Sequence, residues 1–272
     1  MSSRHRPSVR DERRAAGAVA RRRRRSLVAV GACVLAVGLL ATGCGGDAGD
    51  DSDPEHRSFA LDGRTLTVDS ADSALELVPA DVDEVRVTRW FDARVVLGGD
   101  PEVTWAMKDD TLTLRVHCSG VVADCSARHR VEVPRGVAVT VKGKDGSVRA
   151  NGFDKALRIE ASDGSVRVDD VSGPLTLRTS DGSVTATGVD SRRVDVDTRD
   201  GSVRLDLTTV PDRVSARGQD GSLTIGLPDA TYRVTAEADD GAVDVSVPRD
   251  ERSPHVVSAR TQDGKVTVRT AN

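Results

Sequence analysis

The sequence predicts an all-β protein, a single-chain β-solenoid of the parallel β-helix kind with coils of about 18–20 residues. An Asp-Gly pair recurs seven times in the second half of the chain, and successive Asp residues lie 18, 18, 19, 20, 20 and 23 positions apart. Apolar and polar residues alternate on both sides of each pair, as in strands with one buried face. Aromatic residues make up only 2% of the chain, which suits a narrow lumen filled by Val, Leu, Ile and Ala.

The Asp-Gly pairs are expected to form the repeat corners. Gly accepts positive φ without a steric cost, and an Asp side chain can bond its own neighbouring backbone. The same pairs could instead close β-hairpins in an antiparallel meander, but the recurrence of like residues at like positions favours stacked coils. The corners are Asp145-Gly146, Asp163-Gly164, Asp181-Gly182, Asp200-Gly201, Asp220-Gly221, Asp240-Gly241 and Asp263-Gly264.

One coil shows the pattern. Leu157, Ile159 and Ala161 alternate with polar residues before the corner, and Val166 and Val168 do so after it. The period of two predicts a strand on each side of the corner. A second corner, rich in Gly, Pro or Asp, then leads into the next coil. On this basis we assign residues 135–272 to the Asp-Gly repeat solenoid.

Residues 59–134 alternate less regularly and hold both Trp and two of the three Phe residues. We expect an N-terminal β cap with degenerate coils, stapled by a disulfide between Cys118 and Cys125. His117 and His129 flank this pair, and we expect surface histidines with satisfied partners, with pH sensing as the alternative. Trp90, Phe91 and Trp105 are expected to pack in the cap, although an exposed contact patch is the alternative reading.

Residues 1–43 read as a secretory signal, with ten Arg in the first 26 residues followed by an uncharged apolar stretch. Its end, Leu40-Ala41-Thr42-Gly43-Cys44, resembles a bacterial lipobox, so Cys44 is the predicted lipidation site. A soluble secreted form and an uncleaved anchor are the alternatives, and the choice between Sec and twin-arginine export stays open. Residues 44–58 are rich in Gly, Ser and Asp and predict a flexible tether.

Charge narrows the range of partners. The whole chain carries −4, and removal of a signal with ten Arg, Asp11 and Glu12 leaves −12. A strongly acidic chain is a poor ligand for nucleic acid or for anionic lipid. The expected partners are an envelope protein or a cell-surface polymer. Membrane lipid is a further expected partner, contacted through the lipid on Cys44 and not through the charge of the chain.

The repeat shows no catalytic constellation, so we predict a protein that is not an enzyme and has no cofactor or metal. A serine column follows the corners, but no histidine accompanies it in the sequence. A ladder of corner Asp residues could collect calcium, but the Gly-Gly-x-Gly-x-Asp pattern of calcium-binding β-rolls is absent, and turn chemistry with solubility is the favoured explanation. The serine column is Ser147, Ser165, Ser183, Ser202 and Ser222, and the outward positions are Arg149, Arg167, Thr185, Arg204, Thr224, Asp244 and Thr267.

Three stretches resemble the DUF4097-type family of candidate adhesins. They are the repeat at 175–184 (Leu-x-Leu-x-Thr-Ser-Asp-Gly-Ser-Val), the segment 83–89, and the block from Cys118 to Pro134, and the likeness spans roughly residues 60–270. The resemblance implies a toast-rack-like β-solenoid that faces the cell envelope and has no catalytic residues. We therefore expect a lipoprotein on the outer face of the membrane with an adhesin-like binding or display role. The alternative is an accessory or sensor component of an envelope stress or signalling system.

Overall fold

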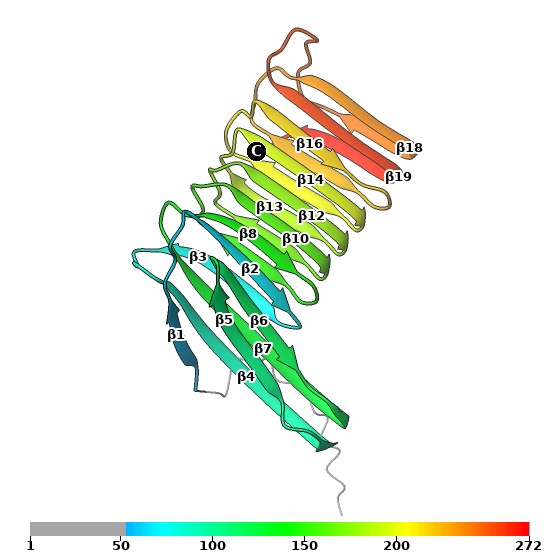
Figure 1. The fold of residues 1–272 in the computed structure, drawn as a ribbon. Coiled ribbons are helices and arrows are strands. Elements are labelled where there is room, and N and C mark those ends of the chain that lie inside the picture. Colours follow the sequence, from blue (N-terminus) through cyan, green and yellow to red (C-terminus); the bar gives the residue numbers. More distant parts are fainter. Residues whose placement is uncertain (1–52, 272) are drawn as a thin grey trace, which may run out of the picture. The chain divides into compact units, whose positions relative to one another are not determined.

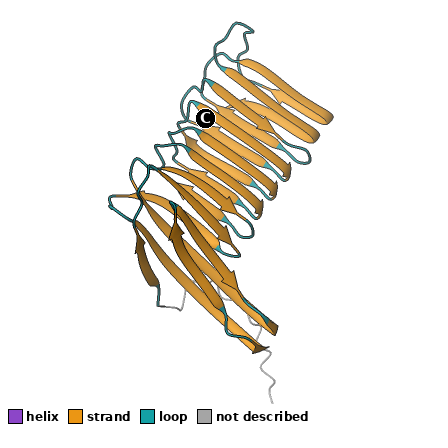
Figure 2. Ribbon diagram, in the orientation of Figure 1, coloured by secondary structure: helices purple, strands orange, loops and turns teal. Residues whose placement is uncertain are grey.

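The computed structural model describes residues 53–271, which form one continuous sheet of nineteen strands. Helices are absent from this described part, so it offers no candidate membrane-spanning helix (Figure 2). The predicted signal and the lipidation site Cys44 lie outside the described residues. The strands are β1 Glu55–Phe59, β2 Thr65–Ala71, β3 Ala74–Ala80, β4 Val85–Gly98, β5 Glu102–Lys108, β6 Thr111–His117, β7 Gly120–Pro134, β8 Ala138–Gly143, β9 Val148–Asn151, β10 Leu157–Asp163, β11 Val166–Asp169, β12 Leu175–Asp181, β13 Val184–Val189, β14 Arg193–Asp200, β15 Val203–Leu207, β16 Arg213–Arg217, β17 Leu223–Leu227, β18 Arg233–Val245 and β19 Val256–Thr270.

From β8 to β17 the chain winds as parallel coils, with one strand before each Asp-Gly corner and one after it. Leu157 pairs with Leu175, and Leu175 pairs in turn with Val194, so equivalent residues stack one coil apart. Strands before the corner form a first face, and strands after the corner form a second face (Figure 1). The predicted β-solenoid is confirmed, and the meander alternative is wrong for this part of the chain.

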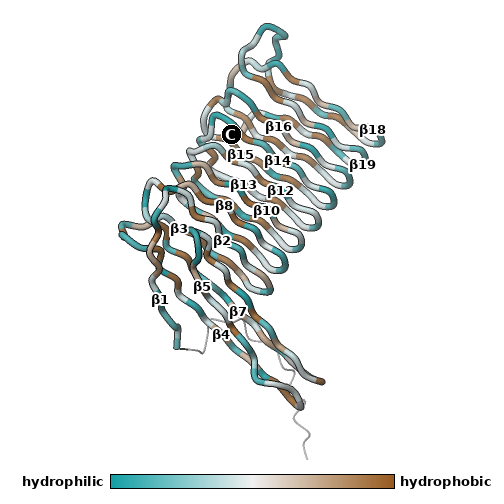
Figure 3. The backbone as a smooth tube through the Cα atoms, in the orientation of Figure 1, coloured by the Kyte–Doolittle hydropathy of each residue, from teal (hydrophilic) through white to brown (hydrophobic). Residues whose placement is uncertain are grey.

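The core lies in the lumen between the two faces and is almost entirely aliphatic. Buried and outward side chains alternate along each strand, and Figure 3 shows the matching alternation of apolar and polar residues. Leu177, Val196 and Ile225 are fully buried. Phe153 and Tyr232 are the largest buried side chains in the described residues, and both lie where the chain turns back toward the first face. Large rings thus enter the lumen only at its margins.

The corner glycines form a close-packed column with φ between 110° and 157°. A Cβ placed on Gly164 would lie 2.8 Å from the carbonyl carbon of Gly146, and the same distance recurs from Gly182 to Gly164. No side chain fits between carbonyl groups this close, since Cβ atoms are not found below 3.0 Å from such atoms. The column explains why the repeat keeps Gly at this position, beyond the conformational freedom that a turn requires.

The N-terminal end departs from the predicted order of coils. β2 pairs with both β6 and β8, and β3 pairs with both β7 and β9, so the first coil lies between two coils that follow it in sequence. Outside it the ladders become antiparallel, with β4 on β7, β5 on β6 and β1 on β4. Strand β1 begins at Glu55, so four of its five residues fall inside the range expected of the tether, 44–58.

The disulfide between Cys118 and Cys125 is present, but its predicted role as the staple of an N-terminal cap is wrong. Cys118 follows β6, and Cys125 lies in β7 opposite Ala93 of β4. Residues 120–127 of β7 pair only with β4, because β3 joins β7 from Arg128 onward. Residues 91–98 of β4 and 120–127 of β7 thus form a two-stranded arm that extends past the coils, and the disulfide closes the turn that leads from β6 into this arm.

The C-terminal end is also out of sequence order. β19 lies between β18 and the coil formed by β16 and β17, so β18 is the last strand of the stack (Figure 1). Both strands are long, 13 and 15 residues, and run through the corner from the first face to the second. The step of 23 residues between Asp240 and Asp263 accommodates the connection that passes from the outer coil back to the inner one.

Candidate binding surface

The seven predicted corners lie side by side at one edge of the coils. The Asp residues pair in register from Asp163 through Asp181, Asp200, Asp220 and Asp263 to Asp240. Asp263 precedes Asp240 in this row because β19 lies between β17 and β18 in the stack. No group of three potential metal ligands forms at this edge or elsewhere in residues 53–271. The in-register stacking of the corners explains why these Asp residues form a ladder.

The first face carries outward charges that neutralise one another across neighbouring strands. Arg115 lies 2.6 Å from Asp69, Arg178 lies 3.6 Å from Glu160, and Arg260 lies 3.2 Å from Glu237. Cations and anions alternate along much of this face, since parallel in-register strands place equivalent positions about 4.8 Å apart. Each exposed pair adds little stability. Along this row of residues little uncompensated charge remains for a ligand, whereas Arg193 and Arg213, neighbours at the start of β14 and β16, have no ion pair in the described residues.

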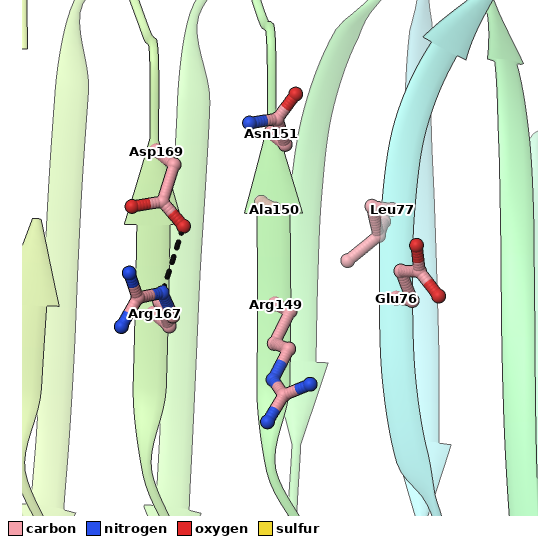
Figure 4. A pocket seen from close by; sticks show the side chains of 7 residues that line it. All are labelled: Glu76, Leu77, Arg149, Ala150, Asn151, Arg167 and Asp169. Atoms are coloured by element: carbon pink, nitrogen blue, oxygen red, sulfur yellow. Dashed lines mark hydrogen bonds and ion pairs between the residues drawn. The ribbon is translucent and has the colours of Figure 1, made fainter. Parts of the chain in front are cut away.

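On the second face, arginines of β7, β9 and β11 gather beside β3. A depression of about 480 Å³ opens there, and Figure 4 shows its side chains projecting from three adjacent strands. We call it the arginine depression. Its lining residues are Glu76, Leu77, Arg149, Ala150, Asn151, Arg167 and Asp169.

Arg149 is the central cation of the arginine depression. Its register neighbours are Glu76 on one side and Arg167 on the other. Both nearby carboxylates already have partners: Glu76 lies 3.1 Å from the guanidinium of Arg130, and Asp169 lies 2.9 Å from that of Arg167. Within residues 53–271 Arg149 has no ion pair. Arg167 beside it carries the same charge, and Glu76 on its other side is already paired with Arg130. The five N–H donors of Arg149 are therefore available to an external acceptor.

A second depression, of about 320 Å³, adjoins the first and shares Glu76 and Arg149 with it. Its far end is formed by Arg128, whose guanidinium carbon lies 4.2 Å from the ring centroid of Trp90. This cation–π contact fixes the arginine against an aromatic face. Arg128 Nε is buried without a hydrogen-bond partner in the described residues. The two depressions thus form one surface with arginines at both ends and in the middle.

Trp90 and Trp105, expected to pack together in the cap, take different roles. Trp105 packs against the hydrophobic core, with the guanidinium of Arg89 4.2 Å from its ring centroid. Arg89 also lies 2.6 Å from a carboxylate oxygen of Glu55. Trp90 lies on the outer side of β4, where its ring makes the cation–π contact with Arg128. Trp105 follows the packing expectation, whereas Trp90 belongs to the candidate surface.

His129 is not the surface histidine that the sequence suggests. Its side chain is fully buried in the lumen, and its Nδ1 lies 3.2 Å from the hydroxyl oxygen of Ser73. Ser73 Oγ in turn lies 2.9 Å from Ser70 Oγ. Burial, with a smaller contribution from the charge of Arg89, lowers the pKa of His129 from 6.5 to about 4. This serine–histidine pair is closed to solvent, and neither serine belongs to the column at the corners.

Sequence reasoning identified Arg149 and Arg167 as outward residues but missed the site they form. Glu76, Arg128 and Arg130 come from β3 and β7, whose place beside β9 results from the exchanged order of coils. The remaining outward positions, Thr185, Arg204, Thr224, Asp244 and Thr267, continue along the same face but do not line the arginine depression. Nothing in the local pattern of residues 74–80 or 120–134 signals this proximity.

Solved structures similar to this chain include two candidate adhesion proteins. A candidate cell adhesion protein from Clostridium sporogenes is 12% identical, with 80% of this chain and 99% of that chain covered and a TM-score of 0.37. A candidate adhesin from Bacteroides fragilis is 11% identical, with coverages of 81% and 98% and a TM-score of 0.30. No curated protein matches the chain significantly. The family model Toastrack DUF4097 matches residues 64–272, which span nearly all of the described strands, and the chain belongs to this family.

Proposed function

We propose that this protein is an exported lipoprotein, held on the outer face of the cell membrane through Cys44, with a non-catalytic, adhesin-like binding role. The basic start, apolar stretch and lipobox-like residues 40–44 support export and anchoring. Two or more acyl chains on Cys44 would give stable attachment, whereas one is marginal. The candidate adhesins among the similar structures agree with a binding role.

The observation that carries the binding role is the arginine depression. Arg149 and Arg167 line it, Arg128 lines the adjoining depression, and Arg130 lies beside Glu76. These four arginines gather on one face of a chain whose net charge, once residues 1–43 are removed, is −12. Arginine forks bind carboxylate and phosphate groups in two-point contacts. We infer that the ligand is an anionic polymer of a cell surface. The adjoining depressions on the second face let an extended polymer lie across successive strands, with Arg149 at the centre of the contact.

The test is binding of the chain from residue 45 onward to polygalacturonate and to polyphosphate, with neutral dextran as the reference, by titration calorimetry at two salt concentrations. The two anions separate a carboxylate ligand from a phosphate ligand. Arg149→Gln should weaken binding about tenfold, because a hydrogen bond to a charged group contributes about 1.5 kcal/mol. Glu76→Gln should strengthen it, since a carboxylate beside Arg149 disappears.

The matched control is Arg178→Gln on the first face, where the exposed arginine already has Glu160 as a partner. This variant should bind like the wild type. Equal losses in Arg149→Gln and Arg178→Gln would mean that net charge alone governs binding, and the arginine depression would not be the site. If neutral dextran bound as tightly as the two anionic polymers, the inference of an anionic ligand would be wrong.

The second candidate function is contact with a membrane sensor as part of an envelope stress or signalling system. It is favoured by Val96 and Val121 on the disulfide-closed arm, which are 58% and 80% exposed. Crosslinking in cells, followed by mass spectrometry, compares the native chain with Cys44→Ser. Crosslinks dominated by one sensor and lost in Cys44→Ser would favour signalling. Crosslinks to wall polymer or to many surface proteins would favour display.

A further inference from the structure

The last strand of the stack, β18, has a free backbone edge. It pairs only with β19, over twelve residue pairs, and no other strand among residues 53–271 lies on its outer side. Its 13 residues make this edge much longer than those of β1 and β5, which have 5 and 7 residues at the opposite end. An unpaired row of N–H and C=O groups is a template for an added strand.

The backbone groups that face outward can be identified residue by residue. Arg233 N–H donates to His255 O and Ser246 N–H donates to Val268 O, each at 2.9 Å, so both residues direct their backbone toward β19. Alternate residues of a strand direct these groups to opposite sides. The outward N–H groups before the corner therefore belong to Val234, Ala236 and Ala238. After the corner they belong to Val243 and Val245.

The lumen is also open at this end. The side chains of Val234, Ala236, Ala238 and Val245 pack against the core from one side only and stay partly exposed. Val243 is 45% exposed, one of three large apolar side chains so exposed in the described chain. A strand added to β18 would extend both faces by one coil, and its apolar side chains would cover these residues.

Charge selects the kind of strand that can be added. β18 carries four acids, Glu237, Asp239, Asp240 and Asp244, and a single arginine, Arg233. Glu237 is already paired with Arg260 of β19 at 3.2 Å, so within the described residues the three Asp residues supply the free negative charge. All four acids are exposed. A second copy of β18, antiparallel and symmetric about Asp239, would place Asp239 opposite its own copy, and like charges on facing strands destabilise a sheet. A strand with Lys or Arg at its outward positions would complement them.

We propose that the outer edge of β18 binds, by β-strand addition, an extended segment of another protein in which basic residues alternate with Val, Ile or Leu. The backbone supplies the hydrogen bonds, the open lumen takes the apolar side chains, and the acidic outward positions select a cationic partner. This interaction uses the C-terminal end of the stack and does not involve the arginine depression.

The test measures fluorescence anisotropy of a labelled eight-residue peptide that alternates Lys and Val, titrated with the chain from residue 45 onward. Two reference peptides accompany it: one with N-methylated backbone at alternate residues, and one with Glu in place of Lys. The N-methylated peptide keeps its charge but cannot complete the ladder. We expect at least a tenfold loss of affinity for each reference peptide.

Ala236→Pro removes one outward N–H while leaving the hydrogen bonds to β19 in place, and an edge strand tolerates such a residue. Ala236→Val is the matched variant that keeps the N–H. We expect weak peptide binding for Ala236→Pro and wild-type binding for Ala236→Val. The reference peptides need only wild-type protein, so they decide the matter even if Ala236→Pro does not fold. Absence of binding, equal binding of the N-methylated peptide, or self-association that Ala236→Pro abolishes would each overturn the proposal.

Discussion

Acidification should unfold this protein partly through one residue, His129. The imidazole lies in the lumen with no exposed surface, and its Nε2 has no hydrogen-bond partner in the described residues. Burial, together with a smaller contribution from the nearby charge of Arg89, lowers its pKa from 6.5 to about 4. The unfolded chain therefore binds a proton more readily than the folded chain does between pH 6.5 and about 4.

The free energy of unfolding follows from this difference. His129 contributes its full stabilisation above pH 6.5, where both states are neutral, and the contribution is lost as the pH falls through this window. The whole loss is about 3 kcal/mol, because each pKa unit corresponds to about 1.4 kcal/mol. At pH 4.5 most of it, roughly 2 to 3 kcal/mol, should already be gone.

Urea unfolding at pH 7.5 and pH 4.5, followed by circular dichroism, measures the effect in the wild type and in His129→Leu. Other groups also titrate in this range, so the informative quantity is the difference between the two proteins. The wild type should lose roughly 2 to 3 kcal/mol more than His129→Leu on acidification. His129→Gln, which can keep a hydrogen bond to Ser73, should resemble His129→Leu. Parallel losses in all three proteins would refute the assignment of this pH dependence to His129.

Two further predictions concern the corner column and the arm. Gly182→Ala should lower the free energy of unfolding in urea by roughly 3 kcal/mol, because positive φ costs about 1–2 kcal/mol and the new Cβ would meet the Gly164 carbonyl carbon at 2.8 Å. Gly136→Ala also has positive φ but meets no atom within 4 Å, so it should lose only about 1 kcal/mol, and equal losses would contradict the close-packed column. Replacing Cys118 and Cys125 by Ser should destabilise their loop by roughly 2–3 kcal/mol. Residues 120–127 pair only with β4, so in this variant limited proteolysis should cut within the arm, while the thermal unfolding of the coils should change little. An equal loss of stability in the arm and in the coils would contradict this prediction.

The sequence predicted the regular part of the fold because its signals there are local. Residues 157–168 alternate around Asp163-Gly164, and the same residue types return 18 to 20 positions later. Stacking such units in sequence order buries every apolar position at once. The coils from β8 to β17 therefore follow directly from periodicity. The lipidation of Cys44 and the boundaries set at residues 43, 58 and 134 stay predictions.

The candidate site could be predicted only in part. Arg149 and Arg167 occupy outward positions in consecutive coils, which the period of two reveals. Their partners across the arginine depression, Glu76 and Arg130, lie in strands whose position depends on the exchanged order of the first coils. Alternation does not distinguish that order from a sequential one, because the same side chains would point outward in both.

The sequence alone therefore determined the kind of structural unit, its corners and which side chains point into the lumen, since these depend on backbone preferences and on burial within one coil. The tertiary structure decided which coils become neighbours at the two ends. That choice depends on long-range pairing of backbone edges, to which every strand of matching length and pattern can contribute. It buries His129 beside Ser73, brings Arg130 beside Glu76 and leaves β18 as the open edge.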